Sequence, residues 1–161
     1  MIAIIAAIDK NNALGFDNKL LFYLPDDLKR FKALTTGHTV VMGRKTFDSL
    51  PKGALPNRRN IVLSRSSKLV LPGAEVYPSL EEALKHCEAD EQVFIMGGAS
   101  VYRQAMTLAD KLFLTEIEAE AKQADVYFPT VDKTVWHETK RDARRADDRH
   151  PYDFSFVDYE R

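Results

Sequence analysis

The chain has 161 residues, of which 45% are hydrophobic and 29% are charged, and its formal net charge is −1. These values predict one globular domain over residues 1–161, without the basic excess that a nucleic-acid or membrane surface needs. No apolar run reaches the ~20 residues that span a bilayer, and the N-terminal MIAIIAAID lacks the basic start and cleavage site of a signal peptide. We therefore expect a cytoplasmic protein without a membrane or nucleic-acid partner, and nothing in the sequence demands more than a monomer.

The single cysteine, Cys87, excludes an intrachain disulfide and fits a reducing compartment, so we expect it to be a small structural residue. The histidines lack the spacing of metal ligands, and no metal is expected. They are His38, His86, His137 and His150.

Short apolar runs alternate with helical patterns along most of the chain. The runs predicted to be strands are 2–8, 39–42, 60–63, 74–77, 92–96 and 111–117. The segments predicted to be helices are 26–35, 45–50, 79–87 and 100–108. Strands that are apolar on both faces and separated by helices indicate an α/β fold with a mainly parallel sheet covered on both sides.

Two segments depart from this alternation. Residues 134–141 and 152–160 each suit a strand, and the charged run DARRADDRHP between them suits the solvated loop of an antiparallel hairpin. Residues 9–23 form a long irregular segment with the flexible Gly15 at its middle, which is typical of a lid or binding loop.

The helix predicted over 26–35 begins with two adjacent aspartates. At about 100° per residue, Asp27 falls within the apolar arc of the helix and Asp26 falls opposite, where it can pair with Arg30. The arc consists of Leu24, Leu28, Phe31 and Leu34. Asp27 is then either a first-turn acid at the rim of the core or a carboxylate held in an apolar pocket. In a pocket, burial would raise its pKa, and an amidine-like N–C–NH2 edge of a ligand would satisfy it.

The strand predicted over 39–42 leads through a glycine into a helix that opens with Arg44, Lys45 and Thr46. Two cations, a hydroxyl and free backbone N–H groups are the components of an anion site, although the spacing is not that of a Walker motif. The alternative is a plain solvated helix start.

Two further strand ends carry comparable motifs. The paired glycines of FIMGGASVY (94–102) permit close approach to a pyrophosphate, although they lack the G-x-G-x-x-G spacing. In IVLSRSS (61–67), Ser64 and Arg65 stand where an NAD-binding protein would show an acid, which suits a 2′-phosphate. Each motif alone is also explained by a tight turn without a ligand. Together they are more informative, because open α/β sheets bind ligands at the carboxyl ends of their strands.

These motifs, together with IAAI, ALGFDNKL, LPDDLKRFK, LPNRRNIVLSR, KLFLTEI and DFSFVDYER in the same order, closely resemble bacterial dihydrofolate reductases nearly from end to end. The resemblance implies a three-layer α/β fold, with an eight-stranded mixed, mainly parallel sheet, four flanking helices and a C-terminal antiparallel hairpin. It implies NADPH-dependent reduction of 7,8-dihydrofolate to 5,6,7,8-tetrahydrofolate for one-carbon metabolism. Hydride would go to C6 and a proton to N5 through water, with support from Asp27. Antifolate inhibitors are the other implied ligands.

The resemblance also assigns the substrate site. Asp27 would bind the N3 and 2-amino edge of the pteridine and accept a hydrogen bond from Thr115, and these two residues are the implied catalytic pair. Arg58 would pair with the α-carboxylate of the substrate, while its neighbour Arg59 would be solvated. Core packing is the alternative for the apolar residues of the set. The residues implied to surround the rings, through backbone carbonyls or side chains, are Ile5, Leu28, Phe31, Leu50, Leu55 and Met96.

For NADPH, the resemblance assigns the nicotinamide amide to the backbones of Ala7 and Leu14. Three side chains would grip the 2′-phosphate: Arg44, Ser64 and Arg65. The family's cis Gly-Gly turn would fall at Gly97–Gly98. The full implied cofactor set adds Gly43, Lys45, Thr46, Leu63, Gly97, Gly98, Ala99, Ser100, Val101 and Tyr102.

The chain departs from the family pattern at Leu21–Phe22, where Pro-Trp is usual, and this leaves the details of proton delivery and antifolate fit open. Ser100 replaces a frequent basic residue, a loss for which Arg65 compensates. Two other functions stay open. One is a reductase of the same fold acting on a riboflavin-pathway pyrimidine, against which Asp27 and Arg58 argue. The other is a catalytically silent folate- or nucleotide-binding module.

Overall fold

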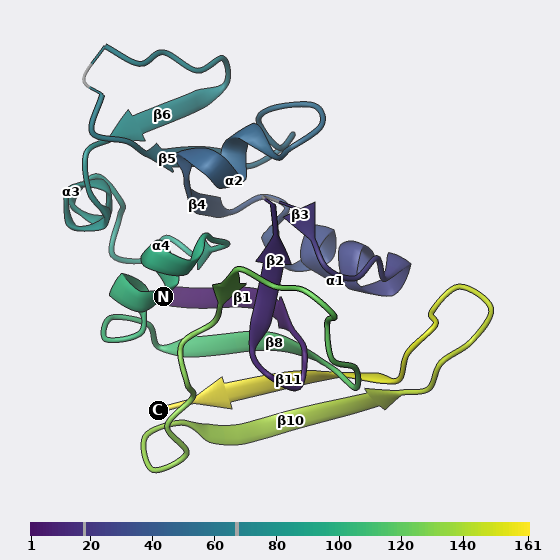
Figure 1. Cartoon of the computed structure of the whole chain (residues 1–161). Helices are drawn as coiled ribbons and strands as arrows, with labels where there is room; N and C mark the ends of the chain where they lie inside the picture. The colour runs from purple at the N-terminus through teal and green to yellow at the C-terminus, as the bar shows by residue number, and fades with distance from the viewer. Residues whose placement is uncertain (18, 67) are drawn as a thin grey trace.

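The structure, a computed structural model, describes residues 1–17, 19–66 and 68–161. Its main sheet contains β1 (Ile2–Ile8), β4 (Thr39–Gly43), β5 (Arg59–Leu63), β6 (Ala74–Tyr77), β7 (Val93–Ile95), β8 (Lys111–Ile117), β10 (His137–Arg144) and β11 (Phe154–Glu160). The strand order is β10-β11-β8-β1-β7-β4-β5-β6, which confirms the eight-stranded sheet (Figure 1).

The six strands from β8 to β6 in this order are parallel. Side chains alternate between the two faces of a strand, and β1 is buried on both faces. Ile4 packs in a core cluster with Val41, and Ile5 packs in a second cluster with Met42. Covering both faces explains why the central strands are continuous apolar runs rather than alternating ones.

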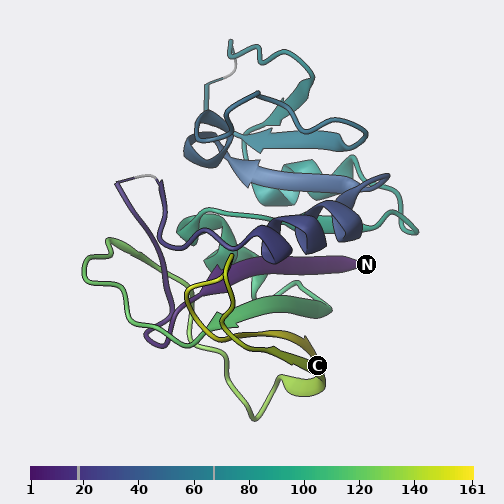
Figure 2. The same cartoon turned by 90° about the vertical axis from the view of Figure 1, so that its right-hand side faces the viewer.

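Four helices in the described part of the chain cover these two faces. The first two, α1 (Pro25–Thr35) and α2 (Arg44–Asp48), pack Phe31 and Phe47 against the cluster that contains Ile5. The other two, α3 (Leu80–Lys85) and α4 (Ala99–Ala105), pack Leu80 and Val101 into the cluster that contains Ile4. The fold therefore has the three layers predicted, with β6 and the β10–β11 hairpin at opposite edges (Figure 2).

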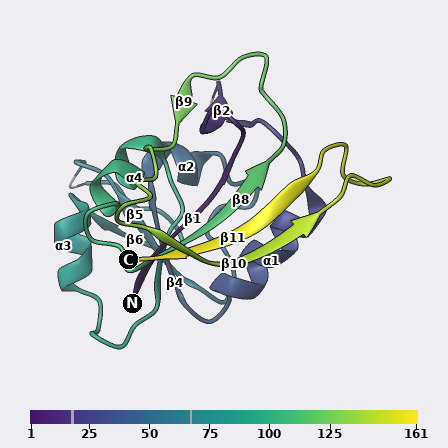
Figure 3. The same ribbon diagram turned by 90° about the horizontal axis from the view of Figure 1, so that it is seen from below.

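The C-terminal hairpin exists, but its first strand begins later than predicted. Residues 134–141 are predicted to be a strand, whereas β10 spans His137–Arg144 and the connecting loop begins after it. The prediction is wrong by three residues because β10 is an edge strand with almost every side chain exposed, so no apolar alternation marks its ends. β11 pairs antiparallel with β8 as well as with β10. The loop end of the hairpin projects from the body of the sheet (Figure 3).

The 9–23 segment is not wholly irregular, contrary to prediction. It contains β2 (Ala13–Phe16) and β3 (Lys19–Leu20), which form a second, antiparallel sheet with β9 (Val126–Tyr127). The Asp125 backbone N–H donates to the Gly15 carbonyl at 3.0 Å, and the Asp17 backbone N–H donates to Asp125 Oδ2 at 3.0 Å. These bonds hold the segment against β9 and the residue that precedes it. Residue 18 of this segment and residue 67 of the 61–67 motif lie outside the described residues.

Cys87 follows α3 and is partly buried against the core cluster that contains Ile4, and its thiol donates to the Ala83 carbonyl at 3.5 Å. It packs at the edge of the core, outside the helix, which ends at Lys85 rather than extending through the predicted 79–87. Over the described ranges, no helix has the length and apolar character needed to cross a membrane, and no group of three or more His, Cys, Asp and Glu side chains is arranged to hold a metal ion.

Candidate active site

The start of α1 positions Asp27. Pro25 occupies the first turn, where its missing N–H costs nothing, and the buried Leu24 precedes it. Asp27 is partly buried, and Oδ1 accepts a hydrogen bond from the hydroxyl of Thr115, which lies in the middle of β8 and is itself buried. The two residues assigned as the catalytic pair therefore meet, although they are far apart in the sequence.

Compared with water, the surroundings of Asp27 favour the protonated, neutral form of its carboxyl group. Burial raises the pKa of Asp27, and the hydrogen bond from Thr115 and the positive charge of Arg30 offset part of this rise. A carboxyl group with such a perturbed pKa, reachable from solvent, is suited to bind a planar N–C–NH2 edge with both oxygens, because the oxygen bonded to Thr115 can accept a second hydrogen bond. This geometry favours the pocket interpretation of Asp27 over a plain first-turn acid.

The ion pair expected between Asp26 and Arg30 does not form. Arg30 Nη2 pairs with Asp158 Oδ1 at 2.7 Å, because the side chain turns toward β11 rather than along the helix. The Asp26 carboxylate turns to the hairpin loop, 3.4 Å from Nη1 of Arg144, and its backbone N–H donates to Nε2 of the buried His150 at 3.1 Å. Asp26 therefore ties α1 to the hairpin, and Arg30 stays on the Asp27 side of the helix.

The apolar residues assigned to the substrate share one region, with one exception. Ile5 is a buried member of the cluster beneath α1 and α2, and four partly buried residues pack against that cluster. These are Phe31, Leu50, Leu55 and Met96. Leu28 lies outside the cluster and is 42% exposed.

The Ile5 carbonyl, assigned to face the pteridine, already accepts one hydrogen bond. The buried Tyr102 hydroxyl donates to it at 2.8 Å from α4, and burial raises the pKa of Tyr102, so the phenol stays protonated. A carbonyl oxygen has two lone pairs and retains acceptor capacity. The side chain of Tyr102 is thus aimed at β1, a role that its position in the glycine-turn motif does not indicate.

The glycine turns of two motifs touch each other. The Gly43 backbone N–H donates to the Gly97 carbonyl at 2.8 Å, and the Gly97–Gly98 peptide bond is cis, as the resemblance implies. Gly97 has φ +134°, and a Cβ on it would lie 3.2 Å from Thr46 Oγ1. Both conditions require glycine at position 97, which leaves backbone rather than side chains facing outward at this point.

The remaining cofactor-assigned residues lie at the same ends of the parallel strands. Leu63 is the register partner of Gly43, so Ser64 and Arg65 follow directly beside the glycine turns. Arg44 is exposed and pairs with Asp48 at 2.9 Å. The others are Ala7 at the end of β1, Leu14 in β2, Lys45 in α2, and Ala99, Ser100 and Val101 at the start of α4.

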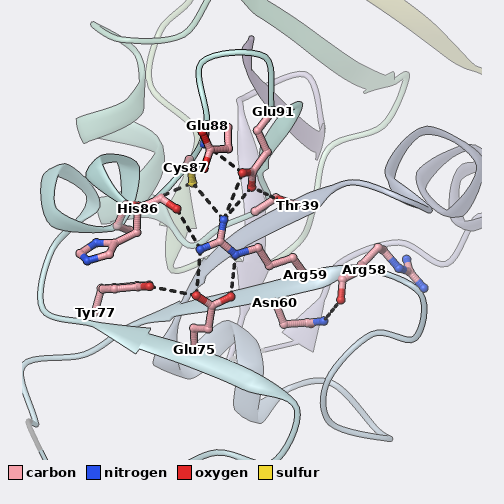
Figure 4. A network of polar contacts seen from close by, with 11 residues as sticks. Thr39, Arg58, Arg59, Asn60, Glu75, Tyr77, His86, Cys87, Glu88 and Glu91 are labelled. Carbon is pink, nitrogen blue, oxygen red and sulfur yellow. Dashed lines mark hydrogen bonds and ion pairs between the residues drawn. The ribbon is translucent and has the colours of Figure 1, made fainter.

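Arg58 and Arg59 are adjacent in sequence but point to opposite sides of the chain (Figure 4). Arg58 donates through Nε to the Pro56 carbonyl at 2.9 Å and through Nη1 to Thr35 Oγ1 at 3.1 Å. Both acceptors are neutral, and within the described part of the chain no carboxylate pairs with Arg58. Asn60 fixes the turn before them, accepting from the Leu55 N–H at 2.9 Å and donating to the carbonyls of Leu55 and Arg58.

Arg59 is not solvated, contrary to expectation. It pairs with Glu75 Oε2 at 2.6 Å and with Glu91 Oε2 at 2.9 Å, and it donates to the His86 carbonyl at 3.0 Å (Figure 4). The network joins β5 to β6 and to the turn before β7, and Glu91 also accepts from Thr39 of β4. Arg59 therefore stabilises the outer strands and leaves Arg58 as the arginine with capacity to bind an anion.

Replacing Arg59 with methionine is expected to lower the free energy of unfolding by about 1–2 kcal/mol at neutral pH, a value discounted because Glu75 is 42% exposed. The hydrogen bond from Arg59 is the main cause of the lowered pKa of Glu75. That stabilisation is present above the unfolded-state pKa and is lost as pH falls through the lower folded-state pKa. Denaturant melts should therefore show the two proteins converging in acid, whereas Arg145→Met, in the exposed hairpin loop, should change stability much less at any pH.

A sequence model of the dihydrofolate reductase family matches residues 1–161 of the chain. The dihydrofolate reductase of Neisseria meningitidis serogroup A is 44% identical over 158 residues, covering 98% of this chain and 96% of its own length. That of Bacillus subtilis is 39% identical over 161 residues, covering 100% and 95%. The solved structure of dihydrofolate reductase from Enterococcus faecalis, complexed with NADP(H) and RAB-propyl, superposes with a TM-score of 0.93 at 33% identity and covers 100% of this chain and 96% of that one. The chain belongs to the dihydrofolate reductase family of NADPH-dependent oxidoreductases.

Proposed function

We propose that the chain reduces 7,8-dihydrofolate to 5,6,7,8-tetrahydrofolate with NADPH, and that Asp27 is the acid on which substrate recognition and proton delivery depend. The observation that carries this role is the Asp27–Thr115 hydrogen bond, which fixes a partly buried carboxyl group beside the apolar cluster of Ile5. A cytoplasmic monomer that contributes to one-carbon metabolism is consistent with this activity and with the composition.

The strand-end residues fit NADPH. The contact between Gly43 and Gly97 brings two backbone turns together where a Cβ at position 97 would strike Thr46, so a pyrophosphate can approach the main chain there. Arg44 and Arg65 are exposed cations beside this point, and Ser64 adds a hydroxyl. This donor set suits a dinucleotide that carries a further phosphate on its ribose.

The protein's contribution to the reaction is orientation and proton supply. When bound, NADPH supplies the hydride that adds to C6 of the substrate. Asp27 accepts hydrogen bonds from the N3 and 2-amino edge of the pteridine, and its negative charge raises the basicity of N5. Water delivers the proton to N5, since Asp27 lies at the other side of the ring in this arrangement.

The two ends of the substrate are held by different elements. Arg58 pairs with the α-carboxylate, since its present acceptors, the Pro56 carbonyl and Thr35, are neutral and weaker.

The 9–23 segment closes over the nicotinamide side from its place against β9, and closure excludes bulk water during hydride transfer.

Loss of NADPH absorbance on addition of dihydrofolate, abolished by an antifolate, is the direct test of the function. Faster oxidation with a riboflavin-pathway pyrimidine would favour the other reductase instead. Tight binding of both NADPH and dihydrofolate without any oxidation would show a silent binding module. Either result would contradict the proposed activity.

Replacing Arg65 with glutamine is expected to raise KM for NADPH about tenfold, the effect of losing ~1.4 kcal/mol of charge pairing with the 2′-phosphate. KM for NADH, which lacks that phosphate, should not change, so the ratio of the two constants isolates the contact. Lys68→Gln removes an exposed cation from the same loop and is the matched control. An equal rise in both KM values would show that Arg65 acts on the fold rather than on the phosphate.

A further inference from the structure

An ion pair, Arg30–Asp158, lies near the hydrogen-bonded pair Asp27–Thr115, on the same face of the sheet. Along β8, Phe113 and Thr115 are two residues apart and point to the same side. Across the antiparallel ladder, Thr115 is paired with Phe156 and Phe113 is paired with Asp158. These four side chains therefore lie together on one face, which α1 covers close to the hairpin strands (Figure 3).

Arg30 occupies this face one helical turn after Asp27, and residues three apart are neighbours on a helix. Its guanidinium pairs with Asp158 at 2.7 Å, and the two side chains are only 18% and 15% exposed. The guanidinium carbon lies 4.6 Å from the ring centroid of Phe156 and 5.8 Å from that of Phe113. An ion pair enclosed by two rings has a defined position, unlike a surface cation that samples many rotamers.

The groups that surround Asp27 come from several elements. β8 contributes the neutral Thr115 hydroxyl. From the other face of the sheet, the buried Tyr102 phenol of α4 is close enough for burial and then the charge of Asp27 to raise its pKa. From α1 itself comes Arg30, the cation that acts on Asp27 among the described residues. β11 contributes Asp158.

Two further acids lie near this face but do not act on Asp27 directly. Asp142 of β10 acts on Arg30. Asp26 turns away toward Arg144 and the hairpin loop.

Because Arg30 and Asp158 carry opposite charges, their effects on the pKa of Asp27 are expected to have opposite signs. Burial lowers the pKa of Arg30, while Asp158 and then Asp27 oppose that shift, so Arg30 remains a cation. A nearby cation disfavours the protonated form of Asp27, and the negative charge of Asp158 cancels part of this effect.

We propose that Arg30, anchored by Asp158, is a positioning residue for the reductase reaction: it favours the ionised form of Asp27 against Thr115 and thereby sets the pH range of activity. This inference rests on the proposed role of Asp27. If the ion pair had only an architectural role, loss of Arg30 and loss of Asp158 would have the same effect, a lower stability. In the proposed role, the two losses shift the pKa of Asp27 in opposite directions.

The test titrates Asp27 directly and then measures activity. The carboxyl 13C resonance of Asp27 is followed against pH in the ligand-free protein, and kcat/KM for dihydrofolate is measured over the same pH range with saturating NADPH. Because the reaction consumes a proton, kcat/KM falls as pH rises through the apparent pKa of the Asp27–pteridine site.

In Arg30→Met, the Asp27 midpoint should move to higher pH, and the ratio of kcat/KM on the alkaline limb to that on the acid limb should rise roughly threefold or more. In Asp158→Asn, the uncompensated Arg30 should move the midpoint to lower pH and reduce the same ratio. Arg30→Lys keeps the charge and should stay near the wild-type midpoint. Lys29→Met removes a cation from the exposed side of α1 and should leave the midpoint unchanged.

Thermal melts establish that each variant is folded. Opposite midpoint shifts in the Arg30→Met and Asp158→Asn variants support the proposal. Shifts in the same direction, or no shift in either variant, overturn it. The NMR titration needs no turnover, so a protein that titrates as expected but does not oxidise NADPH with dihydrofolate would refute the proposed function and leave the electrostatic arrangement standing.

Discussion

Replacing Asp27 with asparagine is expected to slow dihydrofolate turnover at neutral pH by on the order of 10²-fold or more. Asparagine has nearly the same shape and its Oδ1 can still accept the Thr115 hydroxyl, so the local geometry survives. The variant lacks the negative charge that raises the basicity of N5 and offers one carbonyl oxygen where the pteridine edge needs two acceptors. Pre-steady-state measurement of hydride transfer with saturating NADPH is the decisive observation.

The pH profile of this variant should change as well as its rate. Without the charge of Asp27, N5 is less basic and its protonation through water needs a higher proton concentration, so the deficit relative to wild type should shrink as pH falls. Thr115→Val provides a milder comparison, since it removes the hydroxyl but keeps the charge, and its deficit should be smaller than that of Asp27→Asn. Wild-type rates for Asp27→Asn at neutral pH would exclude the proposed role.

The same substitution should not destabilise the fold at neutral pH. Burial raises the folded-state pKa of Asp27 above its unfolded value, so the stability it allows is present below the unfolded pKa and declines as pH rises through the folded pKa. Wherever the buried carboxyl group is ionised it destabilises the folded state, and asparagine removes this cost. An equal or higher Tm together with a large loss of rate would show that function and stability are opposed at this residue.

The second large effect is expected at Arg58. Arg58→Leu should raise KM for dihydrofolate about 100-fold, the effect of removing roughly 2–3 kcal/mol of charge-assisted pairing, while kcat changes little. The pairing is far from the reacting atoms and is equally strong in the ground and transition states, so it affects binding rather than chemistry. Steady-state kinetics at saturating NADPH separate the two constants.

A substrate variant supplies the control for Arg58. Dihydropteroate has the same ring system without the glutamate, so wild type and Arg58→Leu should have similar KM values for it. Arg58→Lys should fall between them with dihydrofolate, because an ammonium keeps the charge and loses the planar pair of donors. An equal KM increase with both substrates would mean that Arg58 supports the fold through Thr35 and Pro56 instead.

The central sheet could be predicted from the sequence because its physical cause is local. The runs 2–8 and 111–117 are apolar on both faces, and β1 and β8 occupy those residues. The second sheet could not, since β3 and β9 are two residues long and give no periodicity. The start of β10 was misplaced for a related reason, as an exposed edge strand carries no apolar pattern.

In the candidate site, too, some features could be predicted from neighbouring residues and others depend on residues far away in the sequence. The anomaly of Asp27 is visible on a helical wheel, because helix geometry is set by neighbouring residues. Thr115 is an unremarkable strand residue in the sequence, and only the family resemblance identified it. The partners of Arg59 lie 16 and 32 residues further along the chain, so no local pattern distinguishes it from Arg58. Arg30 has a sequence signal, a cation one turn after the anomalous acid, but its orientation depends on Asp158 in the last strand.

The Asn60 side chain fixes more than a turn. Its three hydrogen bonds to Leu55 and Arg58 fix the number of residues between Leu55 and β5. A shift of the strand register by one residue would turn every later side chain of β5 to the opposite face of the sheet. Arg58 would then lie on the side of Glu75 and Glu91, and Arg59 would lie on the side proposed to bind the substrate. The number of residues from Leu55 to Asn60 should consequently be constant among active homologues, even where the residue types differ. Insertions and deletions should instead be found before Leu55, near Gly53, where a Cβ would meet nothing within 4 Å.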